Sequence, residues 1–352
     1  MIKKLFCAAL MALAVAACSK DEAAKEAESQ EMATIHLSVS PYEIVTKNTD
    51  PKHGDNKYLD SVRIIDVFVF REGGALEAFK HFSVTDAGGM DLSNLPINAT
   101  VGNKTIYVVA NAKENSWAGV VREETFLNLV VPLQKETLPN FTMAAKTTVN
   151  LQDDQVVSVV LKKLVAKVIV KGIKTNFAGG PYEGIKLRNV KMYLTNISGA
   201  KTYMGEDPST KVILNSKGYS QEDYNGCMMT ALFAEGVPGL VGDDGYTTAH
   251  HFYCYENLMD TETSANRFTR LVVEANLDGT VYYYPVDINQ PGYGWDSSIG
   301  HKGVKRNTCY TYNFTITGPG SDDPESKIVL KTITLDASVE SLTDTPEYSV
   351  SF

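Results

Sequence analysis

The sequence lacks the short motifs that mark the common enzyme classes. It has no Gly-x-Ser-x-Gly elbow, no His-Glu-x-x-His zinc motif, no Gly-x-x-x-x-Gly-Lys phosphate loop and no Gly-x-Gly-x-x-Gly dinucleotide loop. These absences lower the expectation of catalysis, and we predict a protein that is not an enzyme and uses no cofactor. An unrecognised hydrolase is the weaker alternative.

Cysteine is scarce, with five residues in the chain, and no Cys-x-x-Cys spacing occurs. This argues against a structural zinc site. The best metal candidate is His250, His251 and Cys254, but adjacent residues on a strand point to opposite faces, so we expect no metal there. The acidic turn at 242–245 lacks the spaced oxygen ligands of a calcium loop, and we expect it to be solvated.

Positive charge is in the minority. The formal net charge is -9 and the sequence pI is about 5.3. Nucleic-acid-binding proteins usually carry a clustered basic surface that matches the phosphate backbone. We therefore expect no nucleic-acid partner.

No apolar run is long enough to span a bilayer as a helix. The longest, residues 5–17, follows Lys3 and Lys4 and predicts a signal peptide over 1–17. It ends in Val15-Ala16-Ala17-Cys18, which resembles the bacterial lipobox. We predict that Cys18 is acylated and becomes the mature N-terminus, anchored to the outer membrane at the cell surface.

Residues 18–33 form an acidic, polar segment that predicts a tether, because it can bury too little apolar surface to offset its ordering entropy. Beyond it, Cys227, Cys254 and Cys309 remain. An odd number of thiols allows at most one intramolecular disulfide, and which two would pair stays open.

Short runs rich in Val, Ile, Tyr, Phe and Thr alternate with turn residues through the rest of the chain, which predicts an all-β protein with minor helix and two domains. Residues 62–70 predict a buried central strand, and 123–131 a short helix. Residues 156–173 predict two successive strands, because β-branched residues dominate them. We expect the loop-rich part of the second half at 205–245.

The two ends of the mature chain resemble each other. Thr34-Ile35-His36-Leu37-Ser38-Val39 and Thr332-Ile333-Thr334-Leu335-Asp336-Ala337-Ser338-Val339 share Thr-Ile-x-Leu and then place apolar residues on one parity. Each would present one apolar face to a sheet. A segment that fits the same groove as another can replace it, which is the physical requirement for strand addition between subunits.

Several stretches, in the same order along the chain, resemble the fimbrillin family, the type V pilins of anaerobic gram-negative bacteria. They are Val62-Arg63-Ile64-Ile65-Asp66-Val67-Phe68-Val69-Phe70, Tyr107-Val108-Val109-Ala110-Asn111-Ala112, Phe252-Tyr253-Cys254-Tyr255-Glu256-Asn257 and Arg306-Asn307-Thr308-Cys309-Tyr310. The resemblance implies two antiparallel β-sandwich or barrel domains of transthyretin-like type, at 34–165 and 166–326, followed by a C-terminal segment at 327–352.

The resemblance also implies a mechanism of assembly. A trypsin-like protease removes the first strand, and the vacated groove accepts the C-terminal strand of a neighbouring subunit. The displaced strand maps to Ile35, Leu37 and Val39. The donor residues map to two alternating sets: Ile333, Leu335, Ala337, Val339 and Tyr348, Val350, Phe352.

The processing site departs from the family pattern, in which stalk subunits are cut at an arginine after the first strand. The first arginine here is Arg63, which we expect inside the core strand, so a lysine of the polar loop at 47–57 would have to serve instead. The candidates are Lys47, Lys52 and Lys57, and Lys47 is the predicted site of cleavage. The predicted function is a structural fimbrial subunit, at the outer membrane and then in the fimbrium. Its partners would be other pilin subunits in a homopolymer or mixed fibre, the membrane through the lipid, and a host or bacterial surface receptor. A non-polymerising lipoprotein that binds glycan or protein, and an anchor or tip subunit, are the alternatives.

Overall fold

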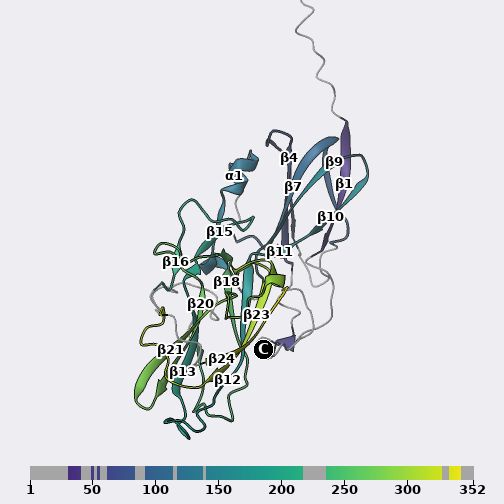
Figure 1. Ribbon diagram of the computed structural model, residues 1–352. Coiled ribbons are helices and arrows are strands. Elements are labelled where there is room, and N and C mark those ends of the chain that lie inside the picture. Colours follow the sequence, from purple (N-terminus) through teal and green to yellow (C-terminus); the bar gives the residue numbers. More distant parts are fainter. Residues whose placement is uncertain are drawn as a thin grey trace, which may run out of the picture.

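The computed structural model describes residues 31–40, 62–83, 92–113, 117–137, 140–216, 235–326 and 333–341, together with the backbone pairing of β2 (Thr49–Asp50) and β3 (Gly54–Asp55). Nearly all described secondary structure is β-strand, which confirms the predicted all-β fold with minor helix (Figure 1). The one α-helix among the described elements, α1 (Glu123–Leu127), lies inside the predicted range but is shorter. No helix in the described ranges is long and apolar enough to cross a membrane.

The first half of the chain forms two sheets. The smaller has the order β10-β1-β6, and the larger has the order β11-β9-β7-β4-β5. Their bounds are β1 (Met32–Ser40), β4 (Ile64–Arg71), β5 (Leu76–Ser83), β6 (Leu95–Thr100), β7 (Gly102–Ala110), β9 (Met143–Leu151), β10 (Gln155–Val160) and β11 (Lys162–Lys163).

The second half also forms two four-stranded sheets, with the orders β18-β12-β23-β24 and β17-β13-β20-β21. Their bounds are β12 (Val165–Thr175), β13 (Arg188–Thr195), β17 (Glu235–Gly236), β18 (His250–Tyr255), β20 (Arg270–Leu277), β21 (Thr280–Asp287), β23 (Thr308–Ile316) and β24 (Ile333–Ser341). The predicted pair of strands within 156–173 is confirmed as β10 and β12, with short β11 between them.

Short pairs complete the fold. One of them, β8 (Val130–Pro132) with β15 (Ala200–Thr202), joins the two halves by an antiparallel ladder. The others are β14 (Ile197–Ser198) with β16 (Ile213–Leu214) and β19 (Asn257–Leu258) with β22 (Gly303–Val304). Pairing is mostly antiparallel, but β1 with β10 and β12 with β23 run parallel.

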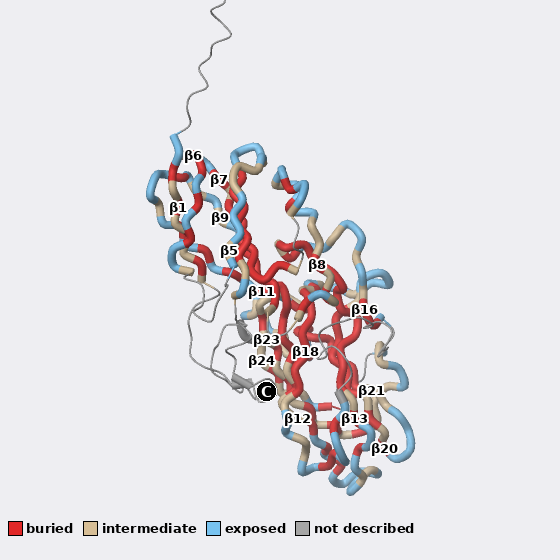
Figure 2. Tube along the Cα trace, turned by 180° about the vertical axis from the view of Figure 1, so that it is seen from behind, coloured by how far each residue is buried: buried red, intermediate tan, exposed pale blue. Residues whose placement is uncertain are grey.

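The five-stranded sheet is buried on both faces. Ile65, Val67 and Val69 of β4 pack into the cluster beneath the three-stranded sheet, while Phe68 and Phe70 point into a second cluster that continues through the second half. Figure 2 shows this buried band running from the upper sheets into the lower ones. Burial on both faces explains why 62–70 is almost continuously apolar rather than alternating.

Phe126 of α1 covers the aromatic face of this sheet. Its ring centroid lies 4.8 Å from that of Phe68 and 4.8 Å from that of Tyr107. The helix is too short to be stable by itself, so this packing holds it in place. The second half therefore meets a face that α1 has already partly closed.

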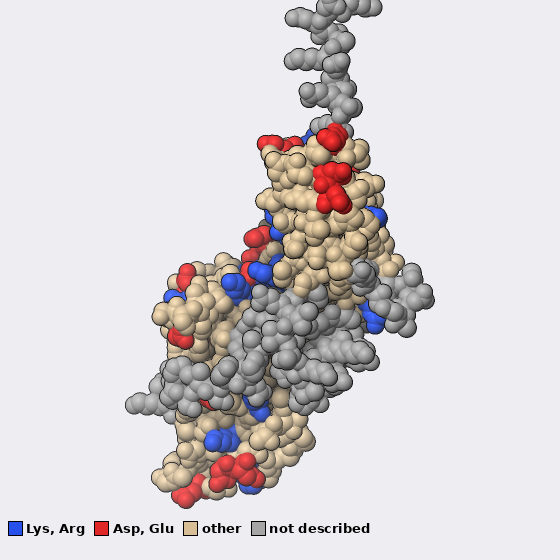
Figure 3. Space-filling view, turned by 90° about the vertical axis from the view of Figure 1, so that its right-hand side faces the viewer, with Lys and Arg blue, Asp and Glu red and all other residues tan. Residues whose placement is uncertain are grey.

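Charges are distributed unevenly on the described surface. On the face drawn in Figure 3, acidic side chains lie at both ends of the molecule and basic side chains mostly toward the middle. No continuous basic stripe is visible among the described residues on that face, in keeping with the net charge of -9.

A buried carboxylate links the halves at their junction. Glu136 accepts hydrogen bonds from the Tyr255 hydroxyl at 3.0 Å and from the Thr142 backbone N–H at 3.0 Å, and the Lys113 ammonium lies 3.7 Å away. Burial raises the pKa of Glu136, because these partners offset only part of the cost of removing the charge from water.

We expect Tyr255→Phe to lower the free energy of unfolding by about 1–3 kcal/mol, because the buried Glu136 carboxylate loses a donor. The loss should shrink as the pH falls through the raised pKa of Glu136, since the protonated carboxyl needs fewer donors. Urea unfolding at several pH values measures both effects.

Tyr193→Phe is the matched control. The Tyr193 hydroxyl donates at 3.3 Å to Glu274, whose side chain is 18% exposed and already pairs with Lys191. Water can replace that donor, so Tyr193→Phe should lower the free energy of unfolding by less than Tyr255→Phe does. An equal loss in both variants at neutral pH would contradict the role given to Glu136.

Candidate site for strand exchange

The predicted displaced strand lies in the middle of a sheet. β1 pairs antiparallel with β6 along one edge and parallel with β10 along the other. Its inward residues Ala33, Ile35, Leu37 and Val39 are all buried, with Ile35 and Leu37 fully inaccessible. β1 therefore fills a groove whose two walls are strands.

The walls of this groove match β1 residue by residue. Ile35 lies opposite Ile97 of β6, and Leu37 lies opposite Leu95 of β6 and Val157 of β10. The floor is the inner face of the five-stranded sheet, with Val67 among its side chains. The sequence analysis predicted β10 as a strand but not β6, which contains a proline, and it did not predict that either strand pairs with β1.

The outer face of β1 is polar. The His36 Nδ1 lies 2.6 Å from the Asn94 side-chain oxygen, to which it donates, and the His36 Nε2 lies 3.2 Å from an Asp154 carboxylate oxygen. The Thr34 backbone N–H donates to Asp153 at 3.2 Å. Exposed contacts of this kind contribute little stability, so the apolar face holds the strand.

The predicted donor strand lies elsewhere, at the end of the second-half sheet. β24 pairs antiparallel with β23 from Ile316 opposite Ile333 to Thr308 opposite Ser341, and no second strand pairs with it among the described residues. Ile333 and Ala337 are buried, whereas Leu335 and Val339 are half-buried. β24 is thus held along one edge where β1 is held along two.

A glycine fixes how close β24 lies to its own subunit. Gly294 has a φ of +95°, and a Cβ placed there would lie 2.8 Å from the Ala337 Cβ. Only glycine fits this close approach without moving the strand. Ala337 must likewise stay small.

Residues of the Arg306-Asn307 and Tyr255-Glu256-Asn257 stretches make hydrogen bonds at the junction between the two halves. The Arg306 guanidinium donates to the carbonyls of Met204 at 2.8 Å and Ala144 at 3.1 Å, and its backbone N–H donates to Glu256 at 3.0 Å. Asn307 accepts the Lys163 backbone N–H at 3.1 Å. The Arg-Asn and Tyr-Glu-Asn stretches therefore support the fold, and no reaction chemistry is needed to explain them.

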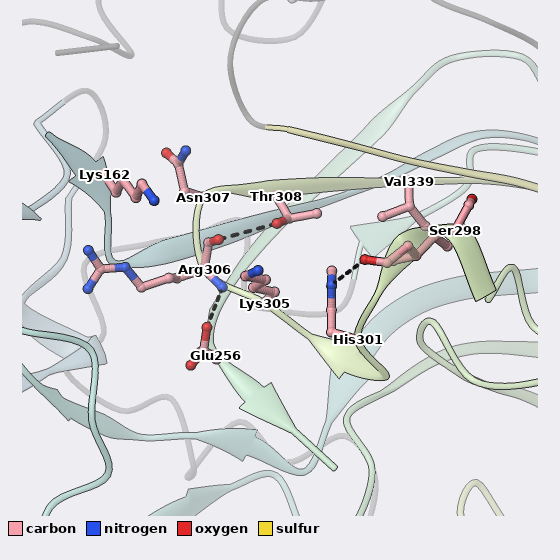
Figure 4. A pocket seen from close by; sticks show the side chains of 10 residues that line it. Lys162, Glu256, Ser298, His301, Lys305, Arg306, Asn307, Thr308 and Val339 are labelled. Carbon is pink, nitrogen blue, oxygen red and sulfur yellow. Dashed lines mark hydrogen bonds between the residues drawn. The ribbon is translucent and has the colours of Figure 1, made fainter. Parts of the chain in front are cut away.

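A basic cavity of about 640 Å³ lies beside the end of β24 (Figure 4). Lys162, His301 and Lys305 line it, and Val339 of β24 forms part of the same lining. Its sequence signal is the short basic stretch at 301–305, directly before the Arg306 motif, which the sequence analysis did not single out.

The cysteine and histidine candidates are strand residues. Cys254 on β18 and Cys309 on β23 flank β12 on opposite sides, opposite Ala166 and Lys167, and no disulfide joins them. Burial raises the pKa of Cys254 to about 12, which leaves the thiol protonated. No metal-binding cluster of His, Cys, Asp and Glu occurs within the described ranges.

The placement predicted for Arg63 is wrong. Arg63 precedes β4 and is exposed, because β4 begins only at Ile64. Its backbone N–H donates to the Asn111 side chain at 2.9 Å. Arg63 lies where the chain enters the core strand rather than within that strand.

Some predicted residues lie outside the described part of the chain. These are the signal peptide and most of the tether, and the individual residues Cys18, Lys47, Cys227, Tyr348, Val350 and Phe352.

Comparisons with known proteins agree with the sequence motifs. The family model described as major fimbrial subunit protein (FimA) matches residues 33–176, from β1 to the end of β12. "Major fimbrium subunit FimC" of Porphyromonas gingivalis is 25% identical over 350 residues, covering 97% of this chain and 71% of that protein. "Putative fimbrium tip subunit Fim1C" of Parabacteroides distasonis is 23% identical over 362 residues, covering 92% of this chain and 89% of that protein.

The fold is also found in solved structures. The crystal structure of a fimbrilin (FimA) from Porphyromonas gingivalis matches with a TM-score of 0.59 and 17% identity, over 90% of this chain and 99% of that one. The family-model match and the two fimbrial relatives confirm the resemblance to the fimbrillin family predicted from the motifs, and the solved structure shows the shared fold.

We expect Leu37→Ala to lower the free energy of unfolding by about 2–5 kcal/mol, because the fully buried side chain leaves a cavity between β6 and β10. Ser38→Ala, on the outer face of the same strand, should change it by less than about 0.5 kcal/mol. Denaturant unfolding of the two variants checks this, and similar losses in both would refute the groove as described.

Gly294→Ala should loosen β24, because the added methyl group meets Ala337. Faster amide hydrogen exchange at 333–341 is the expected result. Gly279→Ala is the control, since Gly279 has a similar φ of +89° but nothing within 4 Å of an added Cβ. If the two variants exchange alike in β24, backbone strain rather than the contact is responsible.

Proposed function

We propose that this chain, as a relative of the fimbrillins, is a structural subunit of a surface fimbria and joins its neighbours by strand exchange. The observation that carries the proposal is the pair of matched strands. β1 and β24 are each nine residues long, and each places four apolar side chains on one parity. One fills an enclosed groove and the other lies at a sheet edge.

The groove cannot stay empty in a folded subunit. Burial of each large apolar side chain contributes roughly 1.5–3 kcal/mol, so Ile35, Leu37 and Val39 together contribute roughly 5–9 kcal/mol. The whole stability of a domain is about 5–15 kcal/mol. Loss of β1 therefore favours capture of a replacement strand.

β24 is suited to be that replacement. In its own subunit Leu335 and Val339 are half-buried, and one backbone edge lacks a strand partner among the described residues. In the groove both edges would pair and the apolar face would be enclosed. Transfer from sheet edge to groove is thus favourable for the strand.

Removal of β1 requires a cut between β1 and β4, after acylation of Cys18 has delivered the protein to the outer membrane. We retain Lys47 as the proposed site. The exposed position of Arg63 makes it a second site that matches the arginine preference of the family. A cut at either residue separates the lipid and β1 from the remaining chain, with the proposed domains at 34–165 and 166–326 otherwise kept.

An uncut subunit would keep both its lipid and its filled groove, which suits an anchor at the base of the fibre. A tip subunit is the other special role, and one matched relative carries a tip-subunit name. The outer-membrane and fimbrial locations, the pilin partners and a surface receptor all follow from the same proposal, which requires no catalysis.

Deletion of 327–352 should abolish polymers while the rest of the protein stays folded, because the deletion removes the donor and leaves the core of the first half intact. Size-exclusion chromatography and electron microscopy of processed protein measure assembly, and circular dichroism checks the fold. Unchanged polymers would refute the proposal and favour a surface lipoprotein that acts as a monomer.

Mass spectrometry of the mature N-terminus distinguishes a stalk subunit from an anchor subunit. A stalk subunit should begin at residue 48 or 64, and Lys47→Ala or Arg63→Ala should block whichever cut is used. An anchor should begin at acylated Cys18. Polymers built from subunits that all retain acylated Cys18 would contradict exchange into the β1 groove.

A further inference from the structure

We infer that the groove accepts the incoming strand in one register, in which Ile333 and Leu335 take the places of Ile35 and Leu37. This inference rests on the proposed function. It also identifies the residues that set the register, namely Leu37 on β1, Asp154 between β9 and β10, and Asp336 and Ala337 on β24.

Side-chain volume favours this register. Ile333 replaces Ile35 and Leu335 replaces Leu37 with no change, and Ala337 replaces Val39 with the loss of two methyl groups. All three positions are at least 96% buried, so the match in volume matters.

A shift of two residues in one direction gives a poor fit. It would place Ala337 at the fully buried Leu37 position, opposite Leu95 of β6 and Val157 of β10. The centre of the groove would then contain a cavity.

Charge disfavours the same shift independently. It would place Asp336 at the position of His36, whose ring lies 3.2 Å from the Asp154 carboxylate. The Asp336 carboxylate would then face the Asp154 carboxylate, and the two negative charges would repel each other. In the inferred register Thr334 takes that position, and Asp336 moves to the position of Ser38.

A shift of two residues in the opposite direction puts Lys331 at the fully buried Ile35 position, where an ammonium group has no access to water. In the inferred register Lys331 falls at Ala33 instead. Ala33 is itself only 2% exposed, but it is the first inward position of β1 and adjoins Met32, which is 62% exposed, so a lysine stem can extend toward solvent there and not at Ile35.

Two grafts in the full chain test the groove itself. The first places residues 333–337 on positions 35–39, which requires His36→Thr, Ser38→Asp and Val39→Ala. The second places 335–339 there, which requires Ile35→Leu, His36→Asp and Leu37→Ala. Both carry three substitutions.

We expect the first graft to retain at least a tenfold larger folding equilibrium constant than the second in urea unfolding. Equal stability, or a more stable second graft, would overturn the inferred register. This comparison needs no polymerisation, so it stands even if assembly fails.

Disulfide trapping tests the register in the assembled fibre. His36 lies opposite Pro96 and Thr34 opposite Asn98. Thr334→Cys should therefore crosslink between subunits with Pro96→Cys and not with Asn98→Cys, when processed protein is treated with a mild oxidant and run on a non-reducing gel.

Crosslinking through position 98, or polymers without a crosslink through position 96, would overturn the register. A complete lack of polymers in the unsubstituted protein would instead contradict the proposed function, and the grafts would still decide which register the groove prefers.

Discussion

Burial of the five-stranded sheet on both faces is the constraint on which the rest of the structure depends. Ile65, Val67 and Val69 of β4 pack under the three-stranded sheet, and Phe68 and Phe70 face α1 and the second half. The two faces belong to separate apolar clusters. Opening the β1 groove would therefore expose one cluster and leave the other closed, which is what a subunit that exchanges one strand needs in order to stay folded.

The sequence predicted what depends on local pattern. The continuous apolar run at 62–70 indicated a buried strand, and the shared Thr-Ile-x-Leu indicated two strands with equivalent apolar faces. It could not predict the parallel pairing of β1 with β10 or of β12 with β23, because pairing joins residues more than a hundred positions apart. The other wall of the groove, β6, was missed because its proline weakens the strand pattern.

Arg63 illustrates how an error of one residue changes a functional conclusion. The apolar run placed it inside the core strand, yet β4 begins at Ile64 and Arg63 is exposed. Strand ends are set by long-range contacts such as the hydrogen bond from the Arg63 backbone to Asn111, which no local pattern reveals. The correction adds a basic residue before the core strand that a protease could recognise.

Ala337 shows how one position meets two requirements. In its own subunit it lies against Gly294, where a larger side chain would push β24 from β23. In the groove it would take the place of Val39, where a larger side chain would fit better. Alanine fits the tighter site against Gly294 and would fill the Val39 position less completely. Under the proposed exchange, β24 needs an acceptable fit in both sites. Ile333 and Leu335, which match the groove without change, would then provide the preference for the groove.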